Sequence, residues 1–234
     1  MSGVEARTVT LDAGEFAYRE AGPPDGTPAV MLHGLGSRAA TWDRIAAGLA
    51  GRGYRTLALD QRGHGDSART ADYSFELLRD DVAAFAAALR LGRFVLIGHS
   101  MGGTAACLYA ERFPDRLTAL VLEDTPPPHY RSTLRIPDQP PADVPFHWPL
   151  APAISAQFAD PDPAWWDDLV KITSPTLVLA GGPTSHVPQD LLAEAAARIP
   201  DGRLVTVDGA GHHIHREYPA EFLAHLTAFL AERG

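Results

Sequence analysis

The chain is poor in two reactive residue types: it has one cysteine, Cys107, and one lysine, Lys171, among its 234 residues. A single cysteine excludes an internal disulfide and a cysteine-ligated metal cluster. Cys107 lies in an apolar, helix-like stretch, where a buried structural thiol is expected. The formal net charge of −9 at pH 7 argues against nucleic acid or an anionic membrane surface as a partner.

Long apolar runs are also absent. No run approaches the length of a membrane span, and residues 1–12 contain no apolar signal core. The sequence therefore predicts a cytoplasmic protein without membrane contact, whose partner is a small-molecule substrate. The chain length fits a single domain over residues 1–234. Nothing in the sequence indicates an oligomeric state.

Short apolar runs typical of buried strands alternate with segments of helical spacing. A hairpin is predicted over 8–11 and 16–19, followed by strands over 29–32, 54–59, 94–97, 117–122, 176–179 and 204–207. Helices are predicted over 41–50, 74–91 with Ser74 as cap, 104–110 and 189–199, with a last one from Pro219. This alternation is typical of an α/β fold, a mainly parallel central sheet with helices on both faces.

Residues 125–173 break the alternation. More than half of the chain's 20 prolines lie there, between Pro126 and Pro163, together with Trp148, Trp165 and Trp166. We expect a short, proline-rich cap inserted in the domain, with Trp148 and Trp165 lining an apolar substrate pocket. The alternative is an irregular loop whose tryptophans pack onto the core.

The motif Gly98-His99-Ser100-Met101-Gly102 stands between a predicted strand and a predicted helix. A G-x-S-x-G sequence in this setting predicts a sharp turn that exposes the Ser100 hydroxyl as a nucleophile. Glycine is needed at 98 and 102 because side chains there would collide in so tight a turn. A serine that merely caps the following helix is the alternative.

A serine nucleophile needs a histidine base, a carboxylate to orient that base, and donors for the developing oxyanion. Among ten histidines, His212 is best placed, since Gly209-Ala210-Gly211-His212 directly follows the last predicted strand. The nearby spacing of His213 and His215 lacks a matching carboxylate cluster, so no metal is expected. No organic cofactor is expected either.

Two further motifs occur in chain order with these, His33-Gly34-Leu35-Gly36 and Asp60-Gln61-Arg62-Gly63-His64-Gly65-Asp66-Ser67. With them the sequence resembles the α/β-hydrolase family over nearly its whole length. The resemblance implies the α/β-hydrolase fold, with Ser100 as nucleophile and His212 as general base. It also implies an oxyanion hole made by the backbone amides of Leu35 and Met101.

The same resemblance assigns supporting roles. It places His33 in the loop that positions the oxyanion hole, and His33 and Gly34 are predicted to bind the substrate there. It implies that Asp60 and Arg62 brace the structure, and that His215 packs behind His212.

The acid departs from the family pattern. Thr184, in Gly181-Gly182-Pro183-Thr184, stands where the family's carboxylate is expected. Asp124 ends the predicted strand that follows the helix after the Ser100 turn. A branch of the dehalogenases is similar in placing its acid at the end of this strand. Side-chain alternation lets only one of Glu123 and Asp124 reach His212, and the family alignment favours Asp124. A structural Asp124 with a broken triad is the alternative.

These residues predict a serine hydrolase that cleaves a small apolar carboxylic ester, thioester or lactone through an acyl-enzyme intermediate. Serine instead of aspartate at position 100 argues against epoxide hydrolase and haloalkane dehalogenase chemistry. Two alternatives stay open. One is a carbon–carbon bond hydrolase or lyase of the same fold. The other is a non-catalytic ligand-binding relative that has lost the acid.

Overall fold

The computed structural model describes residues 3–129 and 139–232; residues 130–138 of the predicted cap lie outside the described part. The described strands form one eight-stranded sheet in the order β1-β2-β4-β3-β5-β6-β7-β8. Strands β1 and β2 pair antiparallel, β2 also runs antiparallel to β4, and all other pairs are parallel. The strands are β1 (Glu5–Leu11), β2 (Gly14–Ala21), β3 (Thr27–Leu32), β4 (Tyr54–Leu59), β5 (Phe94–His99), β6 (Leu117–Glu123), β7 (Thr176–Ala180) and β8 (Gly202–Thr206).

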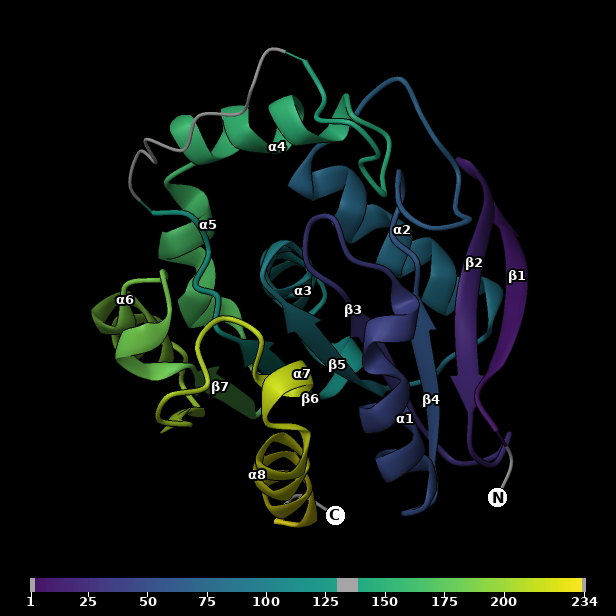
Figure 1. The fold of residues 1–234 in the computed structure, drawn as a ribbon. Coiled ribbons are helices and arrows are strands. Elements are labelled where there is room, and N and C mark those ends of the chain that lie inside the picture. The colour runs from purple at the N-terminus through teal and green to yellow at the C-terminus, as the bar shows by residue number, and fades with distance from the viewer. Residues whose placement is uncertain (1–2, 130–138, 233–234) are drawn as a thin grey trace.

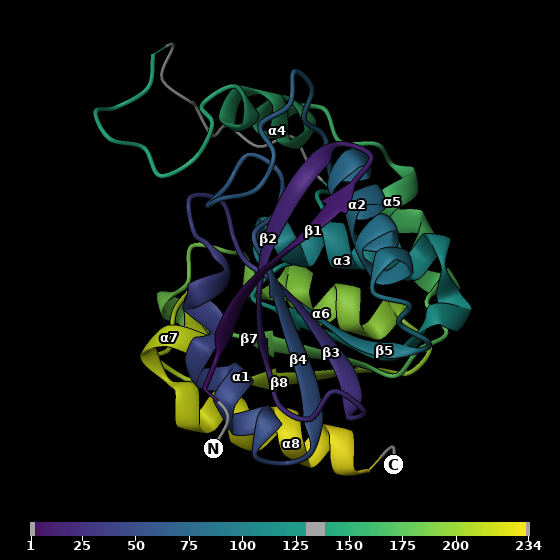
Figure 2. The same cartoon turned by 90° about the vertical axis from the view of Figure 1, so that its right-hand side faces the viewer.

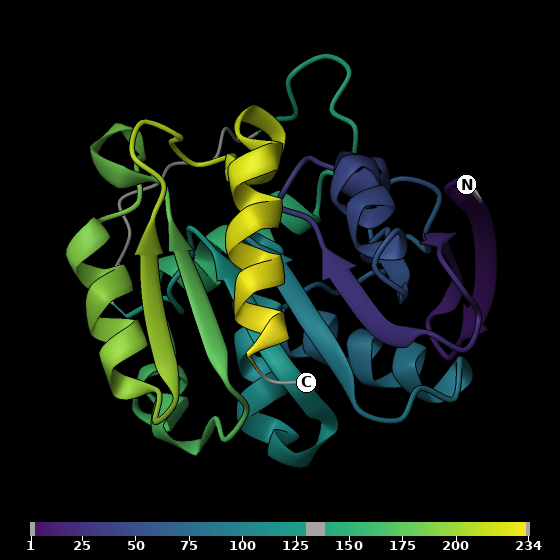
Figure 3. The same ribbon diagram turned by 90° about the horizontal axis from the view of Figure 1, so that it is seen from below.

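Helices cover both faces of this sheet, as the sequence predicts (Figures 1 and 2). Along β3, Ala29 and Met31 point into one apolar cluster while Val30 and Leu32 point into the other, as expected for a strand buried on both faces. The first cluster is completed by α1 (Asp43–Ala50) and α8 (Pro219–Ala231), and the second by α2 (Phe75–Ala88), α3 (Met101–Arg112) and α6 (Gln189–Arg198). Figure 3 shows α8 lying across one side of the sheet. No helix in the described ranges is long and apolar enough to cross a membrane.

Element ends differ from the predictions by a few residues. The predicted helix over 74–91 ends at Ala88, since Arg90 adopts a left-handed φ of 51° and Leu91 N–H closes the helix on the Ala86 carbonyl. The predicted cap is confirmed, because Ser74 Oγ accepts a hydrogen bond from Leu77 N–H at 3.1 Å. The helix predicted from residue 41 begins at Asp43, after a 3-10 turn over Ala39–Trp42. The last strand, predicted over 204–207, begins two residues earlier, at Gly202.

The segment between β6 and β7 contains two short helices, α4 (Leu150–Ala159) and α5 (Ala164–Asp167), followed by a 3-10 turn, Asp168–Lys171. Trp165 and Trp166 of α5 are buried in the cluster that also contains α2 and α3. The chain before α4 is fixed to the loop after β4, where His147 N–H donates to the Gly63 carbonyl at 2.7 Å. This part of the chain therefore packs on the domain from Phe146 onward, whereas residues 139–143 are exposed.

Cys107 lies on α3 and is fully buried, as predicted. Its thiol is 3.6 Å from Glu111 Oε1, one helical turn away. Burial raises the pKa of Cys107 well above its ordinary value. The thiol therefore stays protonated and unreactive.

Candidate active site

Ser100 occupies a strained turn between β5 and α3. Its backbone has φ 53° and ψ −122°, a conformation that costs roughly 1–3 kcal/mol for a residue with a side chain. The turn requires glycine, since a Cβ at Gly98 would stand 2.5 Å from the Gly102 carbonyl oxygen and one at Gly102 would stand 2.6 Å from that of His33. The Ser100 side chain makes no capping hydrogen bond to α3. Its hydroxyl is thus turned away from the helix terminus.

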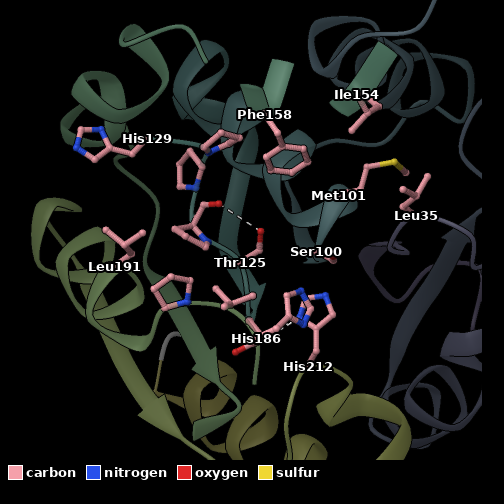
Figure 4. Close-up of a pocket in the computed structure, with 16 residues that line it drawn as sticks. Leu35, Ser100, Met101, Thr125, His129, Ile154, Phe158, His186, Leu191 and His212 are labelled. Atoms are coloured by element: carbon pink, nitrogen blue, oxygen red, sulfur yellow. Dashed lines mark hydrogen bonds and ion pairs between the residues drawn. The ribbon is translucent and has the colours of Figure 1, made fainter. Parts of the chain in front are cut away.

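Ser100 faces a cavity of about 370 Å³ at the carboxyl ends of the parallel strands. The lining is mostly apolar and comes from the turns after β3, β5, β6, β7 and β8 and from α4 and α6. Its residues are Leu35, Ser100, Met101, Asp124, Thr125, Pro126, Pro127, Pro128, His129, Ile154, Phe158, His186, Val187, Pro188, Leu191 and His212. Figure 4 shows Leu35 and Met101 at one end, and His129 and Leu191 at the other. Ser100 and His212 lie between these ends.

Asp124 holds His212 from the end of β6. Its Oδ2 lies 2.8 Å from His212 Nδ1 and also accepts a hydrogen bond from Ser185 Oγ, while Oδ1 accepts one from Gly181 N–H at 2.9 Å. Burial by itself raises the pKa of Asp124, but the hydrogen bonds from His212, Ser185 and Gly181 outweigh it and hold the pKa below its ordinary value. Asp124 is therefore ionised at neutral pH and can accept the Nδ1 proton of His212, an arrangement that favours the tautomer whose Nε2 is an acceptor. Thr184 is exposed.

Glu123 points to the opposite side of β6 and pairs with a different histidine. Its carboxylate accepts hydrogen bonds from His215 N–H at 2.9 Å and from His215 Nδ1 at 2.8 Å. The other ring nitrogen lies 2.8 Å from Thr41 Oγ1, and the ring stacks on Trp42 at 4.2 Å. The two neighbouring carboxylates therefore hold two histidines, His212 in the loop after β8 and His215 in the short helix α7 (Ile214–Glu217), and His215 has the packing role expected of it.

A third histidine, His99, holds the main chain of the loop that carries His212. His99, the last residue of β5, is almost fully buried, and its Nε2–H donates to the His212 carbonyl oxygen at 2.7 Å. Burial lowers the pKa of His99 to about 3. The main chain of His212 is thus held by His99 while its ring is held by Asp124. In the described ranges, no group of three or more His, Cys, Asp or Glu side chains is arranged to hold a metal ion.

His33 and Gly34 shape the neighbouring loop without lining the cavity. His33 is fully buried; its Nδ1–H donates to the Gly34 carbonyl at 2.8 Å and its Nε2 accepts from Gln61 N–H at 3.1 Å. A Cβ on Gly34 would stand 3.1 Å from that of Ser100, so glycine lets the loop approach the serine. The bracing expected next to this loop is also present. Asp60 Oδ1 accepts from Ala39 N–H at 2.5 Å, and Arg62 forms a buried bidentate pair with Asp81 at 2.5 and 2.6 Å.

Trp148 and Trp165, predicted to line the pocket, are not among its described lining residues. Trp165 is buried and packs edge-on against Phe75 at 5.6 Å, and Trp148 lies 6.1 Å from Phe146 in a stacked arrangement. Their large apolar surface is used in packing, the alternative left open above. The apolar wall is formed instead by Ile154 and Phe158 of α4.

Sequence reasoning also missed Ser185 and His186, which lie in the loop after β7. Ser185 donates to Asp124, and the His186 ring lies 4.3 Å from the His212 ring at the cavity. The sequence did contain a signal for Ser185. A carboxylate at Asp124 needs hydrogen-bond donors, and Ser185 offers a hydroxyl directly after Thr184, where the family's acid is expected. No sequence feature distinguishes His186 from the other histidines.

Three buried histidines make stability sensitive to acid. Burial lowers the pKa of His33 to about 4 and the pKa values of His64 and His99 to about 3, against 6.5 for unfolded histidine. Below pH 6.5 these histidines become protonated in the unfolded chain but stay neutral in the native protein. The free energy of unfolding therefore decreases as the pH falls toward their native pKa values. Glu111 has the opposite effect on stability, because burial raises its pKa to about 8. Between its ordinary pKa and about pH 8, the native protein holds the Glu111 proton that the unfolded chain releases, so Glu111 adds stability as the pH falls.

We expect the free energy of unfolding to fall by about 3 kcal/mol per pH unit between pH 6 and pH 5, corresponding to two excess protons taken up on unfolding. Urea unfolding curves at the two pH values measure this change. Replacing His64 by phenylalanine removes one titrating group and should make the slope shallower by about 1.4 kcal/mol per pH unit. A stability that is independent of pH across this window would contradict the assignment of buried, neutral histidines.

Comparison with known proteins agrees with this geometry. The family model described as alpha/beta hydrolase fold matches residues 27–145. The chain is 30% identical to the sn-1-specific diacylglycerol lipase ABHD11 of Mus musculus, covering 86% of this chain and 80% of the mouse protein. It is 29% identical to a non-heme chloroperoxidase of Streptomyces lividans, covering 94% and 98%.

Solved structures resemble the whole fold. A thermophilic esterase from Thermogutta terrifontis superposes with a TM-score of 0.82 at 23% identity, covering 97% of this chain and 98% of the esterase. A membrane phospholipase A superposes with a TM-score of 0.79 at 28% identity, covering 98% and 86%. With the family model matching more than half of its length, this chain belongs to the alpha/beta hydrolase fold family.

Proposed function

We propose that the protein is a serine hydrolase that cleaves a small apolar carboxylic ester, thioester or lactone through an acyl-enzyme. One observation carries the proposal. The strained turn at Ser100 and the Asp124–His212 pair meet in one cavity together with Leu35 and Met101. A serine nucleophile requires a base, an orienting carboxylate and backbone donors, and this cavity brings a candidate for each together.

In this mechanism Ser100 Oγ attacks the carbonyl carbon while His212 Nε2 takes its proton. Asp124 keeps the imidazole in the required tautomer and stabilises the imidazolium ion that forms. The amides of Leu35 and Met101 donate to the tetrahedral oxyanion, with Met101 at the positive end of α3. His212 then gives the proton to the leaving alcohol or thiol, and afterwards activates the water that releases the acid.

The cavity supports an apolar substrate. Ile154, Phe158 and Leu191 face it, and Pro126, Pro127 and Pro128 form a wall without backbone N–H donors. Its volume of about 370 Å³ is at the small end of the range for ligand sites. Relatives named as a diacylglycerol lipase and an esterase agree with ester cleavage.

Labelling with a small fluorophosphonate tests the proposal, because only an activated serine reacts. Intact mass should show a single adduct, and peptide mass mapping should place it on Ser100. The labelled protein should no longer hydrolyse p-nitrophenyl butyrate. A folded protein that gains no adduct would favour a ligand-binding relative. Adduct formation combined with turnover of a vinylogous diketone, and none of esters, would favour a carbon–carbon bond hydrolase.

A further inference from the structure

His64 stands at the point where the loop after β4 meets the loop that carries Leu35. We propose that His64 is a positioning residue for the oxyanion hole, which it supports by holding the Leu35–Gly36 peptide through its neutral imidazole. The inference rests on the proposed function, since it assumes that the Leu35 amide binds the oxyanion. His64 itself is not among the described residues that line the cavity.

The orientation of the Leu35 amide depends on the two peptide planes that flank Leu35. The Leu35 N–H belongs to the same planar unit as the Gly34 carbonyl, so the hydrogen bond from His33 Nδ1–H to that carbonyl fixes its direction. The next planar unit joins the Leu35 carbonyl to the Gly36 N–H. Its N–H donates to His64 Nε2 at 3.1 Å. His33 therefore holds the plane before Leu35 and His64 holds the plane after it, and neither plane can flip without losing its hydrogen bond, which is buried at His33 and part-buried at His64.

The imidazole of His64 can accept this bond because it is unprotonated at Nε2. Its Nδ1 lies 3.2 Å from the Arg62 carbonyl oxygen, which can only accept, so Nδ1 carries the proton. The side chain is fully buried and touches His33 edge-on at a ring distance of 4.8 Å. Burial lowers the pKa of His64 to about 3, so the ring is neutral at neutral pH.

The chain preceding α4 covers His64 from outside. Phe146 stacks on the His64 ring at 5.4 Å and pairs with it in an isolated antiparallel bridge. The phenyl ring also passes over Gly36, where an added Cβ would stand 3.7 Å from it. Phe146 thus shields the Gly36–His64 hydrogen bond from water, which strengthens the bond's hold on the loop.

The test is His64→Phe, which keeps an aromatic ring between His33 and Phe146 but removes the acceptor. The probes are a butyl trifluoromethyl ketone, whose oxygen becomes an oxyanion when Ser100 adds to its carbonyl carbon, and the matching methyl ketone, which binds without that addition. Affinity for the trifluoromethyl ketone should fall about 10- to 100-fold in His64→Phe, with kcat falling in parallel. Affinity for the methyl ketone should stay within about twofold, because only transition-state binding is lost. His64→Gln, whose amide oxygen can accept from Gly36, should recover part of the loss, and His225→Phe on α8 should change neither affinity.

Hydrogen exchange gives a readout that does not depend on activity. The amides of residues 34–37 should exchange faster in His64→Phe than in the wild type. Unchanged exchange and unchanged trifluoromethyl ketone affinity, or equal losses for both ketones, would overturn the proposal. A wild type that does not bind the trifluoromethyl ketone covalently would overturn the proposed function, and with it the catalytic consequence of His64. Exchange would then still show whether His64 holds the loop, so the two failures are distinguishable.

Discussion

Replacing Ser100 by alanine is expected to lower kcat for p-nitrophenyl butyrate by about 10⁵- to 10⁶-fold, to the level that binding alone provides. The variant loses the atom that forms the acyl-enzyme, whereas His212 and the oxyanion donors remain. Alanine has no more difficulty than serine with the left-handed backbone at this position, where φ is 53°. Affinity for the methyl ketone should therefore persist, and its measurement separates lost chemistry from lost structure.

Ser174→Ala is the matched control for this variant. Ser174 lies just before β7, at the end of the sheet away from the cavity, and its hydroxyl is buried without a hydrogen-bond partner in the described residues. Its removal should leave kcat unchanged. Turnover in Ser100→Ala above about one thousandth of the wild-type rate would mean that another group attacks the ester.

Replacing Asp124 by asparagine is expected to lower kcat by about 10⁴-fold with little change in KM. Asparagine has nearly the same shape, but it cannot stabilise the imidazolium, and its NH₂ group can hold His212 in the wrong tautomer. The loss should appear in kcat because the charge on His212 develops only during reaction. Initial rates over a range of ester concentrations give both constants.

Asp190→Asn provides the comparison for this second variant. Asp190 is an exposed residue in the first turn of α6, close in sequence to the loop that carries Ser185 and His186. It makes the same chemical change without touching His212, so kcat should stay at the wild-type level. If Asp124→Asn turned over substrate at a near-wild-type rate, Asp124 would not be the orienting acid.

The sheet, the serine turn and the neighbourhood of Asp124 were predictable because each is encoded locally. Strand and helix periods are visible in short windows, and the collision that requires Gly98 and Gly102 involves residues only a few positions apart. The search for another acid began with Thr184, which stands where the family's carboxylate is expected. Alternation along β6 lets only one of Glu123 and Asp124 reach His212, and the resemblance to the family favoured Asp124.

The walls of the cavity were not predictable in the same way. A tryptophan has the same composition signal whether it packs on Phe75 or faces a ligand, and only tertiary contacts decide between these. Trp165 is buried in the core, whereas Ile154 and Phe158 reach the cavity because of how α4 docks. The bond between His64 and Gly36 joins residues 28 positions apart, a distance that no local pattern can reveal.

Asp124 directly follows β6, so the residue that orients His212 and the residues of the loop after β7 that face the cavity lie on different segments. If the carboxylate followed β7, one loop would have to do both. Residues 186–188 face the cavity, but the acid that orients His212 is fixed on the neighbouring strand. Ser185 is the loop side chain that bonds directly to Asp124 through a short hydrogen bond, next to the backbone contact at Gly181. Under the proposed function, we therefore expect substitutions of His186, Val187 and Pro188 to change which ester is accepted without displacing the Asp124 carboxylate from His212.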